Sequence, residues 1–264
     1  MRLFNKYTLT AMLFTSAMAC KKIITVDVNN AAPVLVVQGN ITNEAGPYTV
    51  KLTKSISYSA DNIYPAVSGA VVKITDDSTG LVDVLTESAA GVYLTDALQG
   101  KPTHTYHLYI KAEGKEYTAV STMPQQVFLD SLSFFTTVAF SRKQTNPMPN
   151  FQDPAGTYNA YRFLQTTNGR PSKQIFVFND RLSDGRYISR QLNNDSTYIQ
   201  SGDTVKLEMQ CIDKQNFEYF KELSRQDPTN GQPTSPANPT NIISNGALGY
   251  FSAHTVQRTQ KVFN

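Results

Sequence analysis

The chain has 264 residues, enough for one large domain or two smaller ones, with 24 Lys and Arg against 21 Asp and Glu. Its formal net charge of +3 falls to +1 without the two basic residues of the N-terminus, Arg2 and Lys6, because 22 then stand against 21. So small an excess gives no support to a nucleic-acid partner. Fourteen Tyr, 14 Phe and a charged fraction of only 17% favour a β-rich protein.

The first 20 residues have the three parts of a bacterial lipoprotein signal. Arg2 and Lys6 precede an uncharged run from Tyr7 to Ala19, and Ala17-Met18-Ala19 supplies small residues around a cleavage point. Cys20 follows directly, at the place where lipid attachment requires a cysteine. The run is too short for a membrane helix, which needs roughly 20 apolar residues.

We therefore predict a signal peptide over 1–19, lipid attachment at Cys20, and a tether over 20–32 between a membrane and the first strand. The alternative is an ordinary secretory signal cut near Ala19. With Cys20 committed to a lipid, Cys211 has no disulfide partner in the chain. Its place in a period-two run predicts a small apolar side chain on a buried strand face.

Short β-like runs follow one another between residues 33 and 123. In one of them Tyr48, Val50 and Leu52 alternate with polar residues, which is the pattern of a half-buried strand. Turns with glycine separate the runs, as at Glu113-Gly114-Lys115. About seven strands in about 90 residues predict an immunoglobulin-like or transthyretin-like β-sandwich over 33–123.

Met123-Pro124-Gln125-Gln126 interrupts this pattern and predicts a boundary before a second, antiparallel β domain over 127–264. Its first strand, or bent pair of strands, is expected over Val127 to Phe140. A loop that contains proline, asparagine and glycine is expected from Ser141 to Thr157. The domain is predicted to end in closing strands over 242–244, 248–253 and 255–263.

One short helix is predicted near 216–225, with Asp213 or Asn216 as its cap and Phe217 and Phe220 on its apolar side. A proline-rich loop over 227–241 follows it. Long loops often carry function, so we consider this segment either a candidate recognition loop or a plain connection. Its prolines are Pro228, Pro233, Pro236 and Pro239.

The sequence contains no pattern of a known catalytic, phosphate-binding or cofactor-binding site, and we expect no catalytic residue, cofactor or metal. His104 and His107 lie three residues apart at a predicted strand, which places them on opposite faces and argues against a shared metal. His254 is expected to be a surface or hydrogen-bonded imidazole.

Asp180 and Asp184 are weak candidates, and the only paired carboxylates that a hydrolytic or Ca²⁺ site could use. Two ligands are too few for Ca²⁺, and the neighbouring Arg181 and Arg186 oppose the negative charge. A hairpin turn with surface ion pairs is the favoured interpretation.

Several dispersed segments of the chain carry a resemblance to a known family. They are Cys20-Lys21-Lys22-Ile23, Leu35-Val36-Val37-Gln38-Gly39, Gly46-Pro47-Tyr48, Gly91-Val92-Tyr93 and Asn245-Gly246-Ala247-Leu248-Gly249-Tyr250-Phe251. These segments resemble the envelope lipoproteins of Bacteroidetes that are grouped as domain of unknown function family 4249. The resemblance implies a lipid-anchored protein of the outer membrane, near TonB-dependent receptors, on its periplasmic or its cell-surface side. It implies no catalytic residue.

Two functions from different classes remain open. The first is a non-enzymatic binding or accessory module that attaches to a membrane through its lipid and binds an outer-membrane receptor or a surface polymer. The second is a glycan-binding or hydrolytic envelope enzyme of an unrecognised type, which would use Asp180 and Asp184.

Overall fold

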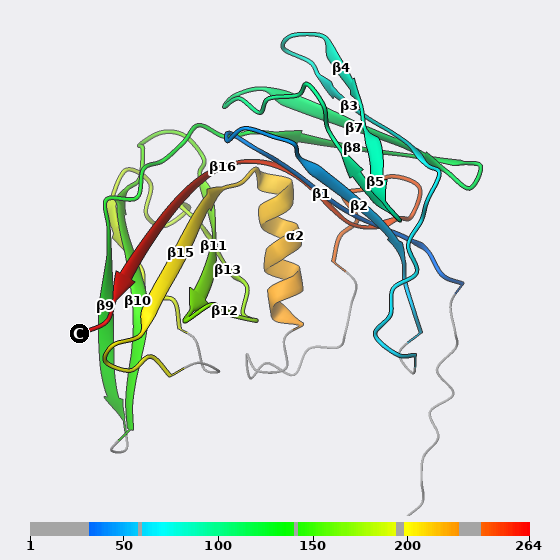
Figure 1. Ribbon diagram of the computed structural model, residues 1–264. Coiled ribbons are helices and arrows are strands. Elements are labelled where there is room, and N and C mark those ends of the chain that lie inside the picture. The colour runs from blue at the N-terminus through cyan, green and yellow to red at the C-terminus, as the bar shows by residue number, and fades with distance from the viewer. Residues whose placement is uncertain (1–31, 58–59, 140–141, 194–197, 227–238) are drawn as a thin grey trace, which may run out of the picture. The chain divides into compact units, whose positions relative to one another are not determined.

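A computed structural model describes residues 32–57, 60–139, 142–193, 198–226 and 239–264 (Figure 1). The predicted signal peptide, Cys20 and the tether up to residue 31 lie outside these described residues. Pro228, Pro233 and Pro236 of the predicted loop lie outside them too. Pro33–Ile56 and Ala60–Asn264 form one compact unit. None of the helices in the described residues is long and apolar enough to cross a membrane.

The described chain is mainly β with one short helix, as the sequence predicts. The first eight strands are β1 (Leu35–Thr42), β2 (Thr49–Lys54), β3 (Val71–Asp76), β4 (Leu81–Val84), β5 (Thr86–Ala89), β6 (Val92–Leu94), β7 (Thr105–Ala112) and β8 (Lys115–Thr122). The later elements are β9 (Ser131–Ala139), β10 (Arg142–Gln152), β11 (Ala160–Thr167), β12 (Arg170–Pro171), β13 (Phe176–Asn179), β14 (Tyr187–Ser189), β15 (Thr204–Cys211), α2 (Lys214–Arg225) and β16 (Leu248–Val262).

The first eight strands form the predicted sandwich. One layer contains β1, β2, β6 and β5, and the other has the order β4-β3-β7-β8. Alternate side chains of both layers, such as Val37 and Leu52 on one side and Val72 and Leu108 on the other, meet in a single core. The alternating pattern of the sequence arises because each strand buries only one of its faces.

β16 joins this sandwich to the rest of the molecule. Its first half pairs with β1 in parallel, from Val36 opposite Leu248 to Thr42 opposite His254, and its second half pairs antiparallel with β15. The result is a nine-stranded sheet with the order β12-β11-β15-β16-β1-β2-β6-β5, in which β13 also pairs with β11. The separate closing strands predicted over 248–253 and 255–263 are one continuous strand. The segment 124–126 lies between β8 and β9.

A second core lies between β11 and β15 on one side and the three-stranded sheet β14-β10-β9 on the other. Aromatic rings fill it: the ring centroids of Phe151 and Tyr161 are 4.8 Å apart, and those of Phe163 and Phe178 are 5.5 Å apart. Such ring pairs add to the free energy gained from burial alone.

The loop predicted from Ser141 to Thr157 was wrong, because residues 142–152 form the strand β10. Its two prolines accept hydrogen bonds through their carbonyls from the segment after β14: Leu192 N–H donates to Pro147 at 2.9 Å, and Arg190 N–H donates to Pro149 at 3.2 Å. The edge of β10 on which each proline lacks an N–H group therefore faces that irregular segment and not β9. The ladder with β9 therefore remains intact.

α2 lies on the concave side of the bent nine-stranded sheet (Figure 1). Asp213 caps it, since its carboxylate accepts the backbone N–H of Asn216 at 2.8 Å, so the helix begins slightly before the predicted range. Phe217 and Phe220 pack against Ala160 of β11 and against Ile212. Packing of this apolar side onto the sheet fixes the helix in place.

We predict that Gly249→Ala destabilises the protein by at least about 3 kcal/mol in urea unfolding. Gly249 has a φ of 100°, and an added Cβ would lie 1.9 Å from the Val37 carbonyl oxygen in the neighbouring β1. The matched control is Gly202→Ala, at a φ of 93° with nothing within 4 Å of the added atom. It should lose only about 1 kcal/mol, from backbone strain. Equal losses in the two variants would contradict the role of close packing between β1 and β16.

Candidate functional site

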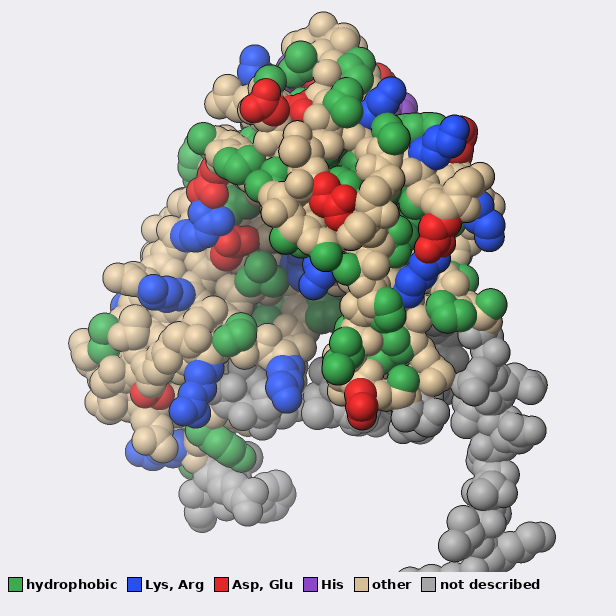
Figure 2. Space-filling model, turned by 45° about the vertical axis from the view of Figure 1, so that its right-hand side comes forward, with side chains coloured by type: hydrophobic (Ala, Val, Ile, Leu, Met, Phe, Trp, Pro, Cys, Tyr) green, Lys and Arg blue, Asp and Glu red, His purple; other side chains and the backbone are tan. Residues whose placement is uncertain are grey.

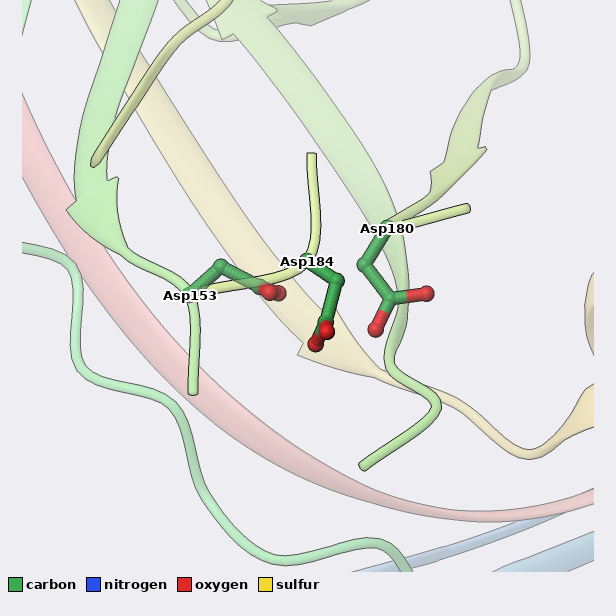
Figure 3. Close-up of side chains that lie close together, drawn as sticks. All are labelled: Asp153, Asp180 and Asp184. Carbon is green, nitrogen blue, oxygen red and sulfur yellow. The ribbon is translucent and has the colours of Figure 1, made fainter. Parts of the chain in front are cut away.

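Three carboxylates meet at one end of the second core (Figure 3). Asp153 follows β10, Asp180 follows β13, and Asp184 lies in the turn before β14. One oxygen from each lies within 4.8 Å of the others. The sequence singled out Asp180 and Asp184 but not Asp153, which is distant in the chain and carries no local signal.

The predicted surface ion pairs of this turn were wrong. Asp180 is only 3% exposed, and neither Asp180 nor Asp184 forms an ion pair with any residue that the structure describes. Both accept backbone hydrogen bonds instead: Asp180 from Asn159 N–H at 2.7 Å and Asp184 from Gly156 N–H at 2.8 Å.

Asp153 is the most deeply buried of the three, at 1% exposed. It accepts hydrogen bonds from the Tyr161 hydroxyl and from Gly185 N–H, the latter at 3.0 Å. Burial raises the pKa of Asp153; the two hydrogen bonds oppose that rise, and the charges of Asp180 and Asp184 add to it. A carboxyl with a raised pKa gives up its proton less readily in the folded protein.

Hard cations bind to carboxylate oxygens, and Ca²⁺ takes six to eight oxygen ligands. Here, however, each carboxylate already holds a backbone N–H from a neighbouring turn, and the Asp180 backbone N–H donates to the Asn159 carbonyl at 3.0 Å. The cluster therefore links the turn after β10 to the turn before β14. Its geometry fits a structural link better than an exposed reaction centre.

The two histidines of the predicted His-x-x-His pair have separate partners. The Nδ1 atom of His104 lies 2.9 Å from the carboxylate of Asp76, and the Nε2 atom of His107 lies 2.6 Å from that of Asp77. Burial alone would raise the pKa of Asp76, but hydrogen bonds, first among them the one from His104, lower it below its usual value. Each imidazole thus contacts a different residue of the turn between β3 and β4.

The buried position predicted for Cys211 is confirmed, since its side chain is 3% exposed on β15. Its burial raises the pKa of the thiol. Of the two alternatives expected for His254, the structure has the hydrogen-bonded one: the residue is 2% exposed, and its Nδ1 atom lies 3.0 Å from the Ser252 hydroxyl. Burial, with a smaller effect from Arg162, lowers the pKa of His254 to about 3.

An open groove of about 650 Å³ lies over β11, β12, β15 and β16. The strand register places the side chains of Leu164, Glu208 and Arg258 in one row across the sheet and those of Thr166, Lys206 and Gln260 in the next. Much of the groove surface is apolar, and hydroxyl, amide and charged side chains lie beside it. No sequence motif identifies this groove, because its residues come from strands that are distant in the chain.

One cation of the groove lining, Lys206, forms no ion pair with any described residue. Arg170 and Lys173 are exposed beside the lining residues Pro171, Ser172 and Gln174. Within the described ranges these two cations likewise have no ion-pair partner.

Acidic groups at the groove are already paired. Glu208 accepts from Arg258 Nε at 2.8 Å, and Arg258 also contacts Glu44 at 2.5 Å. On the face drawn in Figure 2, by contrast, Lys and Arg are interspersed with Asp and Glu, and neither sign forms a broad patch.

A family model described as domain of unknown function (DUF4249) matches residues 21–260. The chain belongs to the DUF4249 family. The match spans the sandwich, the acidic cluster and the groove, so all of these are parts of the DUF4249 domain. No curated protein matches the chain.

His254 should make this DUF4249 domain sensitive to acid. Its pKa is near 6.5 in the unfolded chain and about 3 in the fold, so the unfolded chain takes up the proton first. The contribution of His254 to the free energy of unfolding is therefore fully present above pH 6.5. It is lost as the pH falls toward 3, and the loss is about 3 kcal/mol at pH 4. His254→Asn should remove this part of the pH dependence in urea unfolding at pH 7 and pH 4.

The control is His107→Asn, since His107 is a more exposed histidine on β7. This variant should keep the same loss of stability between pH 7 and pH 4 as the unchanged protein. If His254→Asn also kept that loss, burial of a neutral imidazole would not be its cause.

Proposed function

We propose that this DUF4249 protein is a lipid-anchored protein of the outer membrane that acts as a non-enzymatic binding module. The support for the anchor is the basic N-terminus, the uncharged run up to Ala19 and the cysteine at position 20. The resemblance to envelope lipoproteins of Bacteroidetes supports the location, on the periplasmic or the cell-surface side.

The groove is the observation that carries the binding function. Lys206 lines it and has no ion-pair partner among the described residues, so an anionic ligand would gain a charge-assisted hydrogen bond there. Thr166, Gln260 and neighbouring polar side chains offer donors and acceptors for hydroxyl groups. We propose an acidic surface polysaccharide as the ligand, bound through its carboxylates and hydroxyls. A neighbouring TonB-dependent receptor would then be the natural partner.

The alternative of a hydrolytic envelope enzyme has weaker support. Its two candidate carboxylates, Asp180 and Asp184, approach each other, but Asp180 is almost completely buried. A general acid must reach the bond that it protonates. Neither residue lines the groove.

From the chemistry of the groove we expect the protein to bind polygalacturonate and not uncharged dextran in isothermal titration calorimetry at low salt. Lys206→Gln should weaken binding about tenfold, because it removes one charge-assisted hydrogen bond worth roughly 1.4 kcal/mol. Affinity should also fall as salt is added. The control Lys115→Gln, at the first residue of β8, removes the same charge outside the groove lining and should leave affinity unchanged. Equal binding of both polymers, or equal loss in both variants, would refute the groove as the site.

If Cys20 carries the lipid, the protein expressed in a bacterial host should incorporate an alkynyl fatty acid. The incorporated fatty acid is detected by attaching a fluorophore to its alkyne. Cys20→Ser should abolish the label and release the protein from the membrane fraction. Cys211→Ser removes the other cysteine and should keep the label. A labelled Cys20→Ser protein would place the lipid elsewhere.

A further inference from the structure

β9 forms an open edge of the three-stranded sheet β14-β10-β9. Among the described residues it pairs with β10 alone, from Ser131 opposite Asn150 to Ala139 opposite Arg142. It lies at the outer side of the ribbon in Figure 1. Such an edge presents a row of unpaired backbone N–H and C=O groups, to which another extended strand can bind.

Edge strands normally carry features that prevent such pairing, but β9 has none. Its nine residues, SLSFFTTVA, include no charged residue, no proline and no glycine. They are rich in β-branched and aromatic side chains, which favour strand pairing.

The other edges of the described sheets are short or covered. β14 has three residues, β12 has two and ends in a proline, and β5 has four with a register shift against β6. β4 also has four. The edge of β8 is occupied, because Thr118 N–H donates to the Ser244 hydroxyl at 2.7 Å and Ser244 N–H donates to the Thr118 carbonyl at 2.9 Å. β9 is thus the exception.

The inner face of β9 holds the strand in a fixed position. Leu132 is 3% exposed in the second core, and the ring of Phe134 packs against Phe263 at a centroid distance of 5.1 Å. The outer face presents Phe135, 47% exposed, between the small residues Ser133 and Thr137. A partner strand would therefore meet an already ordered edge and would pay little additional entropy.

We propose that β9 pairs with β9 of a second copy of this chain, antiparallel and about a two-fold axis at Phe135. Phe135 is the central residue of Ser131–Ala139, so this register pairs all nine residues. The strand carries no charge, so the two copies meet without repulsion, and the paired surface is the same on both, as a two-fold interface requires. The two sheets become one with six strands, and the two Phe135 rings lie side by side on its outer face.

Cysteine cross-linking tests this register in envelope membranes with the full chain. Phe135→Cys should form a covalent dimer under mild oxidation, because residues opposite each other in an antiparallel pair have Cα atoms about 4.5–5.5 Å apart, within disulfide reach. Thr137→Cys should not cross-link with itself, since the two copies of residue 137 lie roughly 14 Å apart. Co-expression of Ser133→Cys with Thr137→Cys should give the mixed dimer. Equal cross-linking at 135 and 137 would overturn the proposal.

A second measurement is independent of cysteine. Analytical ultracentrifugation of the full chain in detergent should give a dimer, and Phe135→Lys should raise its dissociation constant at least tenfold, because a charge placed on the axis meets its own copy. Unchanged urea unfolding of a dilute sample of this variant would exclude loss of the fold as the cause. If the unchanged chain is monomeric at all concentrations and Phe135→Cys does not cross-link, the proposal fails, and the edge is left to a strand from a different protein.

Discussion

The parallel pairing of β1 with β16 is the interaction on which the rest of this structure depends. It connects residues at opposite ends of the described chain, with seven pairs from Val36 opposite Leu248 to Thr42 opposite His254. Without it, the part of the nine-stranded sheet that belongs to the sandwich and the part that covers the second core would be separate sheets, each with an additional open edge. The glycine at position 249 makes the contact close, because the Val37 backbone occupies the space where a side chain would stand.

A buried polar network strengthens the same junction from the side. The Ser121 hydroxyl of β8 bonds to the Asp213 carboxylate and accepts the Ala253 N–H at 2.8 Å. Asn216, in the first turn of α2, donates to the Phe251 carbonyl at 3.0 Å. Strand β8, the helix cap and β16 are thus connected by bonds that are costly to break in a dry environment. Specific orientation of these elements follows from that network and not from apolar packing alone.

The sequence predicted those features that depend on local patterns. The alternation in Tyr48, Val50 and Leu52 indicated a half-buried strand, and the cap and apolar spacing indicated the helix at Phe217 and Phe220. β10 was missed because Pro147 appeared to exclude a strand, and only the position of its neighbours shows that the lost donor is tolerated.

Features that depend on distant residues could not be predicted. Asp153 joins Asp180 only after β10 and β13 have been placed in the fold. The groove requires β11, β15 and β16 to lie side by side, and the partner of β1 is more than two hundred residues away. Periodicity assigns a strand to a face but does not name the strand beside it.

The order of synthesis gives the β1–β16 pairing a further consequence. β1 emerges from the ribosome more than two hundred residues before its partner β16, so one edge of β1 stays unoccupied until β16 has been synthesised. Contacts between such distant residues form slowly, because the loop between them must close first. A nascent chain of this kind stays unfolded longer than one built from local hairpins, and loss of β16 would expose apolar residues of both cores at once.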